Sequence, residues 1–175
     1  MTRRVKQGFT LPELLVVLFL LSLLSSFLLR CFAAVATQQE QRLALLELEN
    51  NLAIAQSWLG DDIAKSSAVL DCAAEQLTLQ QDQLVSYTLG TDQQITEHLY
   101  PLEGKILYRK ESTQWNRQPM ANFIETLTIF YYDAQGQPTV DSTAVCAVGV
   151  QLTGCWREQQ ITKRQVVQLM GDGYL

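Results

Sequence analysis

The spacing of apolar residues changes along the chain and divides it into three regions. Residues 14–29 form an uncharged apolar run that is broken only by three serines. From Arg30 to about residue 60, leucine and alanine recur every three or four positions, which is the period of one helix face. From Gln76 onward the period falls to two, as in strands. The pattern therefore predicts a long N-terminal helix followed by a sheet.

The first region has the length of a membrane-spanning helix. Residues 14–29 span about 24 Å as a helix, short of the roughly 30 Å of a bilayer core, whereas residues 9–29 reach about 31 Å. Three cations precede the run, Arg3, Arg4 and Lys6, and one, Arg30, follows it directly. The excess of positive charge places the N-terminus in the cytoplasm. We therefore expect residues 9–30 to cross the membrane and the rest to lie in the periplasm of a bacterium.

Glu13 is a carboxylate inside this predicted membrane helix. A charged side chain at the centre of a bilayer costs about 3 kcal/mol on scales derived from insertion experiments. Such a group is normally paired with an opposite charge. A plain single-pass anchor would leave Glu13 unexplained, so we expect it to have a partner.

The second region predicts an amphipathic stem over residues 31–67, and the third a body over residues 68–175. The apolar stripe of the stem consists of Leu45, Leu48, Leu52, Ala55 and Leu59. Gly60-Asp61-Asp62 indicates the end of the helix, with one more turn through Ile63 as an alternative. The predicted strands cover residues 77–79, 84–89, 98–102, 105–110, 124–132, 144–152 and 161–169. The fold class is therefore α+β, a long helix followed by a mostly antiparallel sheet.

Charge and composition argue against a nucleic-acid-binding protein or an enzyme. The chain has 175 residues and a net charge of −5, and beyond Arg42 it is acidic and has no basic stripe for a phosphate backbone. His98 is the single histidine and has no nucleophile or acid arranged around it, so a surface or strand-end position is expected. Asp61, Asp62 and Asp92 lack EF-hand spacing. We expect neither catalysis nor a metal or other cofactor.

Four cysteines are present and none forms a C-x-x-C pair. An oxidising compartment favours a disulfide. Cys146 and Cys155 stand on one predicted strand, roughly 30 Å apart if it is extended, and a disulfide needs Cα atoms within about 7 Å. Cys72 is therefore the expected partner of one of them, with a slight preference for Cys146, which is predicted to lie on the apolar face of its strand. We expect Cys31, just outside the membrane helix, to remain a free, small, buried side chain.

An ordinary cleaved secretory signal is the main alternative for the N-terminus. Basic residues, an apolar run and small residues at Ala34-Val35-Ala36 fit such a signal. Cleavage after Ala36 would release a secreted or periplasmic binding protein. The length of the apolar run, Arg30 and Glu13 argue against this alternative.

The sequence Gly8-Phe9-Thr10-Leu11-Pro12-Glu13-Leu14-Leu15, after a basic leader and before a long apolar helix, resembles the class III signal of type IV pilins and type II secretion pseudopilins. The resemblance implies that a prepilin peptidase removes residues 1–8 by cutting between Gly8 and Phe9, and that the new amine of Phe9 is N-methylated. It also implies that Glu13 pairs with the Phe9 amine of an adjacent subunit. Pro12 departs from the more common leucine, but the first turn of a helix tolerates proline.

The order of the predicted strands resembles, more loosely, that of the larger minor pilins and the J-type minor pseudopilin. The segments that carry this resemblance are residues 85–87, 105–109, 129–133 and 145–152. It implies a low-copy subunit that joins other minor and major subunits at an inner-membrane assembly platform and primes or caps a filament. Whether that filament is a pilus, a secretion pseudopilus or a DNA-uptake fibre stays open.

Overall fold

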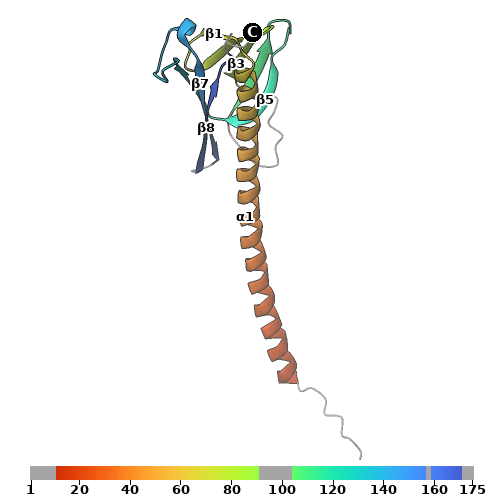
Figure 1. Ribbon diagram of the computed structural model, residues 1–175. Coiled ribbons are helices and arrows are strands. Elements are labelled where there is room, and N and C mark those ends of the chain that lie inside the picture. The colour runs from red at the N-terminus through yellow and green to blue at the C-terminus, as the bar shows by residue number, and fades with distance from the viewer. Residues whose placement is uncertain (1–10, 91–103, 157–158, 171–175) are drawn as a thin grey trace, which may run out of the picture. The chain divides into compact units, whose positions relative to one another are not determined.

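The computed structural model describes residues 11–90, 104–156 and 159–170. The chain forms two compact units, Met1–Arg42 and Leu43–Leu175. A single helix, α1 (Leu11–Ala64), provides all the described secondary structure of the first unit and then enters the second (Figure 1). This confirms the predicted long helix. The helix continues past Gly60-Asp61-Asp62 and ends at Ala64, as in the alternative with one more turn through Ile63, and Gly60, Asp62 and Ile63 are buried.

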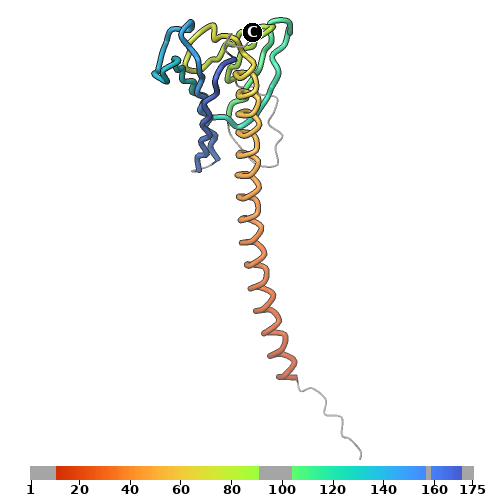
Figure 2. The backbone as a smooth tube through the Cα atoms, in the orientation of Figure 1, coloured from red at the N-terminus to blue at the C-terminus, as the bar shows by residue number. Residues whose placement is uncertain are grey.

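The rest of the second unit is made of two antiparallel sheets. The first sheet holds β1 (Ala68–Asp71), β2 (Gln76–Gln80), β3 (Leu84–Gly90), β4 (Lys105–Glu111) and β5 (Gln118–Ile124), in that order. The second holds β6 (Thr126–Tyr132), β7 (Ala147–Trp156) and β8 (Gln159–Gln168), and a short 3-10 helix, η1 (Ser142–Ala144), precedes β7. The backbone passes from α1 into β1 through three residues (Figure 2). The α+β prediction is thus confirmed, with two sheets instead of one.

Two predicted strands differ most from the observed ones. The apolar run of residues 124–132 is not one strand, because it is divided at Glu125, whose amide donates a hydrogen bond to the Thr153 carbonyl. Ile124 therefore ends β5 and the next strand begins at Thr126. The strand expected from Ala144 begins instead at Ala147, since residues 142–144 form η1. The predicted strand at residues 98–102 and the predicted turn near Arg157 lie outside the described residues.

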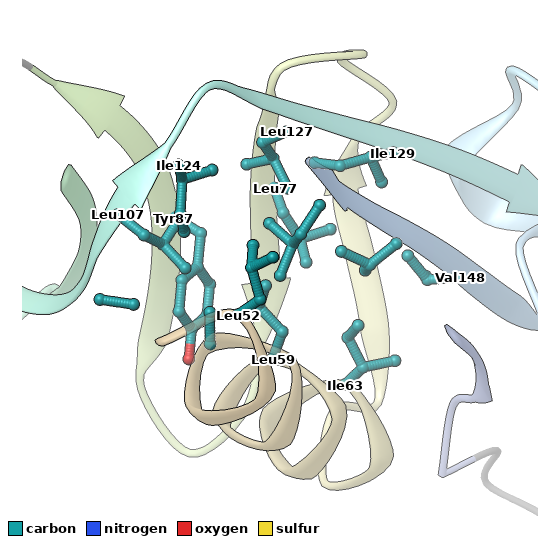
Figure 3. Close-up of a cluster of buried hydrophobic side chains, with 14 of the residues drawn as sticks. Leu52, Leu59, Ile63, Leu77, Tyr87, Leu107, Ile124, Leu127, Ile129 and Val148 are labelled. Atoms are coloured by element: carbon teal, nitrogen blue, oxygen red, sulfur yellow. The ribbon is translucent and has the colours of Figure 1, made fainter. Parts of the chain in front are cut away.

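One core joins the helix to both sheets. The buried face of α1 consists of Ala44, Leu48, Leu52, Ala55, Leu59 and Ile63, each at most 1% exposed. Figure 3 shows Leu52, Leu59 and Ile63 of α1 pointing toward side chains of the two sheets. The labelled sheet residues are Leu77, Tyr87, Leu107 and Ile124 from the first sheet and Leu127, Ile129 and Val148 from the second. The predicted stripe is thus the core face of α1, except that Leu45 is only partly buried.

Two glycines, the exposed Gly104 and the buried Gly154, allow close contacts with the backbone of Phe123. A Cβ atom on Gly104 would lie 2.6 Å from the Cα of Phe123, a residue held at a φ of 64° that bulky side chains rarely adopt. A Cβ atom on Gly154 would lie 2.6 Å from Leu48 Cδ1 and 2.9 Å from the Phe123 carbonyl oxygen. Because backbone atoms are involved at both sites, neither clash is relieved by turning one side chain.

We expect Gly104→Ala and Gly154→Ala each to lower the free energy of unfolding by about 1–3 kcal/mol, the usual cost of an added methyl group that forces the backbone to shift. Gly60→Ala is the matched control, because its Cβ would meet only the end of the Gln165 side chain and alanine favours a helix interior by about 1 kcal/mol. Denaturant unfolding of the full chain in detergent measures all three variants. Equal stability of the Gly104 and Gly60 variants would contradict the packing argument.

Candidate functional site

The helix of the first unit is apolar on all sides. Every large apolar side chain from Leu11 to Val35 is 46–76% exposed. A helix of this kind is stable in a membrane or inside a larger assembly, because exposing a continuous apolar surface to water is energetically unfavourable. Length and composition make α1 a candidate membrane span near the N-terminus.

Hydroxyl groups in this part of α1 are bonded within the helix. The hydroxyls of Ser22 and Ser26 donate to the carbonyl oxygens of Phe19 and Leu23, at 2.7 and 2.8 Å. The hydroxyl of Thr37 donates to the Ala34 carbonyl at 2.9 Å. These bonds matter in lipid, where a polar group must find its partner within the protein. Ser22 and Ser26, two of the three serines that interrupt the apolar run, are therefore compatible with a membrane helix.

Glu13 lies in the first turn of α1 as the structure describes it, with Pro12 beside it, and is exposed. The dipole of the helix favours an acid there by about 0.3–1 kcal/mol. That gain is smaller than the roughly 3 kcal/mol cost of a charge at mid-bilayer. Glu13 has no hydrogen bond or ion pair with any of the described residues. The described part of this chain therefore supplies no compensating charge for Glu13. The predicted cleavage residues Gly8 and Phe9 lie outside this described part.

A buried polar cluster connects the end of α1 to the first sheet. One oxygen of the Asp62 carboxylate, Oδ2, accepts hydrogen bonds from the Tyr87 hydroxyl at 2.6 Å and from Nε of Arg109 at 2.7 Å. Arg109 also donates to Glu111. The side chains of Asp62 and Arg109 are 8% and 13% exposed. The Tyr87 ring crosses the core with its hydroxyl toward α1 (Figure 3). The cluster therefore fixes α1 against β3 and β4.

The surroundings of Asp62 keep it ionised. Burial alone would raise the pKa of this carboxyl, but the hydrogen bonds from Arg109 and Tyr87 and the charge of Arg109 outweigh burial, so its pKa lies below the ordinary value. The pKa of Tyr87 is raised, first by burial and then by the neighbouring carboxylate. Burial lowers the pKa of Arg109, but Asp62 and Glu111 raise it by more. The cluster is thus a charged pair with a neutral tyrosine as a second donor.

Sequence reasoning missed this cluster, because it treated Asp61-Asp62 as the end of the helix and looked there only for a cation site, which the spacing did not support. One signal was present in the sequence. Asp62 follows Ala55 by seven residues, and so lies on the stripe that the apolar residues define. An acid on a core stripe indicates a buried partner.

The cysteines do not form the predicted disulfide in this structure. Cys72 is a free, half-buried thiol, and Cys146 is free and exposed. Cys146 does not lie on the apolar face of β7, because it precedes that strand and Val145 takes the buried position. The pKa of Cys72 is raised, first by burial and then by the nearby charges of Asp71 and Asp141. Cys31 is free, as expected, but the expected burial is wrong, because this thiol is exposed on α1. The pairing of Cys72 with Cys146 or Cys155 stays a prediction.

A surface groove with a volume of about 900 Å³ lies at the end of the second sheet. It is lined by the turn of residues 133–136 and by side chains of the three strands, among them Tyr132, Ala147 and Val166. Cys146 and Asp133 also line it. Within the described ranges, no group of three or more histidine, cysteine, aspartate or glutamate residues could hold a metal ion. His98 lies outside those ranges.

Comparison with known proteins bears on the N-terminal segment. Residues 3–29 match the prokaryotic N-terminal methylation motif. The match covers the basic leader, Gly8, Phe9, Glu13 and the apolar run. It supports a class III signal on a type IV pilin-like protein that is processed by prepilin peptidase. No curated protein and no solved structure matches the chain.

Proposed function

We propose that this chain is a minor pilin-like subunit, a structural protein without catalytic activity that primes or caps a type IV pilus or a type II secretion pseudopilus. The observation that carries the proposal is the N-terminal methylation motif joined to an apolar helix with an acid in its first described turn. The α+β body that follows the helix supports it. The loose resemblance of its strand order to the larger minor subunits supports the minor role.

The proposed mechanism begins in the inner membrane, with the N-terminus in the cytoplasm and the body in the periplasm. Prepilin peptidase cuts between Gly8 and Phe9 and so creates an α-amino group, which is largely cationic at neutral pH. This amine, once methylated, then pairs with Glu13 of the adjacent subunit. A carboxylate that is unfavourable alone in lipid becomes favourable when that neighbour arrives. The pair therefore sets the register between subunits, which is the best-attested use of buried charges.

The alternative, a protein released by ordinary signal peptidase, receives less support. Ala36 lies in the interior of α1, and the Thr37 hydroxyl bonds to the Ala34 carbonyl beside it. Cleavage there requires helical hydrogen bonds to break before a protease can bind the backbone. An enzyme is also disfavoured, because the sequence shows no nucleophile and base arranged for catalysis.

The mass of the mature N-terminus, measured on chain purified from cells with and without prepilin peptidase, tests the proposal. We expect a chain that begins at methylated Phe9 in the first case and at Met1 in the second. A chain that begins at Thr37 would support release by signal peptidase, and an uncut chain in both cases would support a plain anchor. Either result would contradict the proposal. In sheared filaments we expect the amount of this chain to be a small fraction of the amount of the major subunit. Equal amounts of the two would overturn the minor role.

A further inference from the structure

The hairpin between β4 and β5, green in Figure 1, carries an almost completely exposed tryptophan. Trp115 is 97% exposed, the highest value for any large apolar side chain in the described part of the chain. The other tryptophans differ from it, since Trp156 is 6% exposed and Trp58 is 47% exposed. Tryptophan is the residue most enriched at the centres of protein interfaces, because its large ring is buried there with few rotamers to fix.

The turn that carries Trp115 is held by hydrogen bonds on its N-terminal side. The amide of Gln114 donates to the Glu111 carbonyl at 3.0 Å, and the Gln114 side chain donates to the Glu111 carboxylate at 2.9 Å. The Thr113 hydroxyl donates to the Gln83 side chain in the neighbouring turn at 2.6 Å. The turn is thus fixed before any partner binds, which reduces the entropy lost on association.

The exposed charges on either side of the Trp115 turn are positive, whereas the second unit as a whole is acidic. Lys110 and Arg117 are exposed on either side of the turn, and the Arg117 guanidinium lies over the Tyr108 ring, 4.2 Å from its centre. Glu111, the acid of this turn, is bonded to Arg109 and Gln114. Residues 43–175, by contrast, contain sixteen acidic and eight basic side chains. A partner surface that complements the turn is therefore apolar at its centre and acidic at its rim.

A membrane surface or a nucleic acid fits these features less well than a protein does. Recognition of anionic lipid typically needs four to eight clustered cations, and a nucleic acid needs a basic stripe. The turn offers two cations on an acidic unit. A buried tryptophan covers about 150–250 Å², whereas a stable interface between free proteins covers about 1,200–2,000 Å². The contact is therefore effective only with a protein that is already held nearby, where the effective concentration is high.

We propose that Trp115 inserts into an apolar pocket with a carboxylate rim on a neighbouring subunit of the same filament, and that Lys110 and Arg117 face that rim. The inference rests on the proposed function, because assembly of the helices supplies the proximity that the small contact requires. It adds a second contact, formed by the body, to the one that Glu13 makes.

Photo-crosslinking in filament-producing cells tests this contact. The probe, p-benzoylphenylalanine, replaces Trp115 in one strain and Val140 in another; Val140 is the matched control because it is 89% exposed and lies on a different loop. We expect the probe at residue 115 to form an adduct with a protein whose own N-terminus begins after a class III cleavage site. The probe at residue 140 should form at least fivefold less of that adduct. No adduct at residue 115, or an adduct only with lipid or DNA, would overturn the inference.

A third probe at Leu18, on the membrane helix, separates this inference from the proposed function. An adduct at Leu18 without one at residue 115 means that the chain assembles and only the Trp115 contact is wrong. Absence of both adducts contradicts the two proposals together. In the strain with the probe at residue 115, Lys110→Glu with Arg117→Glu should reduce the adduct at least fivefold, whereas Lys65→Glu, an exposed cation elsewhere, should not. An unchanged adduct would overturn the acidic rim.

Discussion

Replacing Asp62 by alanine is expected to destabilise the second unit by about 3–5 kcal/mol, the range for breaking a buried ion pair from one side. The Arg109 side chain is 13% exposed, so the variant leaves a guanidinium in the core with Glu111 as its remaining acid. The Tyr87 hydroxyl also loses its acceptor. Because domains are stable by only about 5–15 kcal/mol, this loss brings the unit close to unfolding at ordinary temperature. Denaturant titration of the full chain in detergent measures the change.

Two further variants separate the charge pair from simple loss of packing. Asp61→Ala is the matched control, because Asp61 is the adjacent acid and is exposed, and it should cost less than about 0.5 kcal/mol. Replacing Asp62 and Arg109 together by leucine should restore most of the lost stability, since an apolar pair often substitutes for a buried ion pair. If Asp62→Ala and Asp61→Ala cost the same, the cluster does not fix the helix to the sheet.

The same cluster predicts the direction of acid destabilisation. The pKa of Asp62 in the folded protein lies below its unfolded value of about 3.9, so the unfolded chain takes up the proton first as the pH falls. The stabilisation is therefore complete above about pH 4 and is lost as the pH falls through the folded pKa. Stability measured from pH 6 to pH 2 should fall less steeply in Asp62→Asn than in the unchanged chain. If stability falls equally steeply with pH in both proteins, carboxylates other than Asp62 cause the loss of stability in acid.

The fold could be predicted from the sequence where local periodicity determines it. Leu48, Leu52, Ala55 and Leu59 repeat at the helix period, and their burial follows from that repeat. The hairpin of β2 and β3 has alternating apolar residues on both sides of a short polar turn, and both strands form as expected. The ends of some strands could not be predicted in this way, because the run on either side of Glu125 is β-prone throughout. Its division depends on a hydrogen bond to Thr153, which lies far along the chain.

The candidate site could be predicted only where it is a linear motif. Gly8, Phe9 and Glu13 stand within six residues, inside the segment that matches the methylation motif, and their individual roles stay predictions. The pairing of Asp62 with Arg109 joins residues 47 positions apart, so the two charges are visible in the sequence but their contact is not. Trp115 illustrates the same limit. An isolated tryptophan in a sequence is more often a core residue, and only the turn at the end of β4 exposes it.

Changing Glu13 to glutamine is expected to leave membrane insertion and cleavage intact and to reduce incorporation into filaments about tenfold to a hundredfold. The amide keeps the shape of the side chain and lowers the cost of placing it in lipid, so the monomer is at least as well inserted. In the assembled state, however, the Phe9 amine of the neighbour is left without an opposite charge. Breaking such a pair from one side costs about 3–5 kcal/mol in a buried setting, and even half of that gives the expected range. Incorporation is measured by immunodetection, as the amount of the chain in sheared filaments relative to the amount in the membrane fraction.

Glu40→Gln is the matched control for this variant, because Glu40 is an exposed acid on the same helix, beyond the apolar run. It should be incorporated like the unchanged chain. Glu13→Asp should recover part of the loss, because it restores the charge on a shorter side chain. This recovery distinguishes a charge pair from a packing role, since aspartate differs from glutamate in shape more than glutamine does. Incorporation of Glu13→Gln at the level of Glu40→Gln would mean that Glu13 needs no partner, and docking would then depend on the apolar surface of α1 alone.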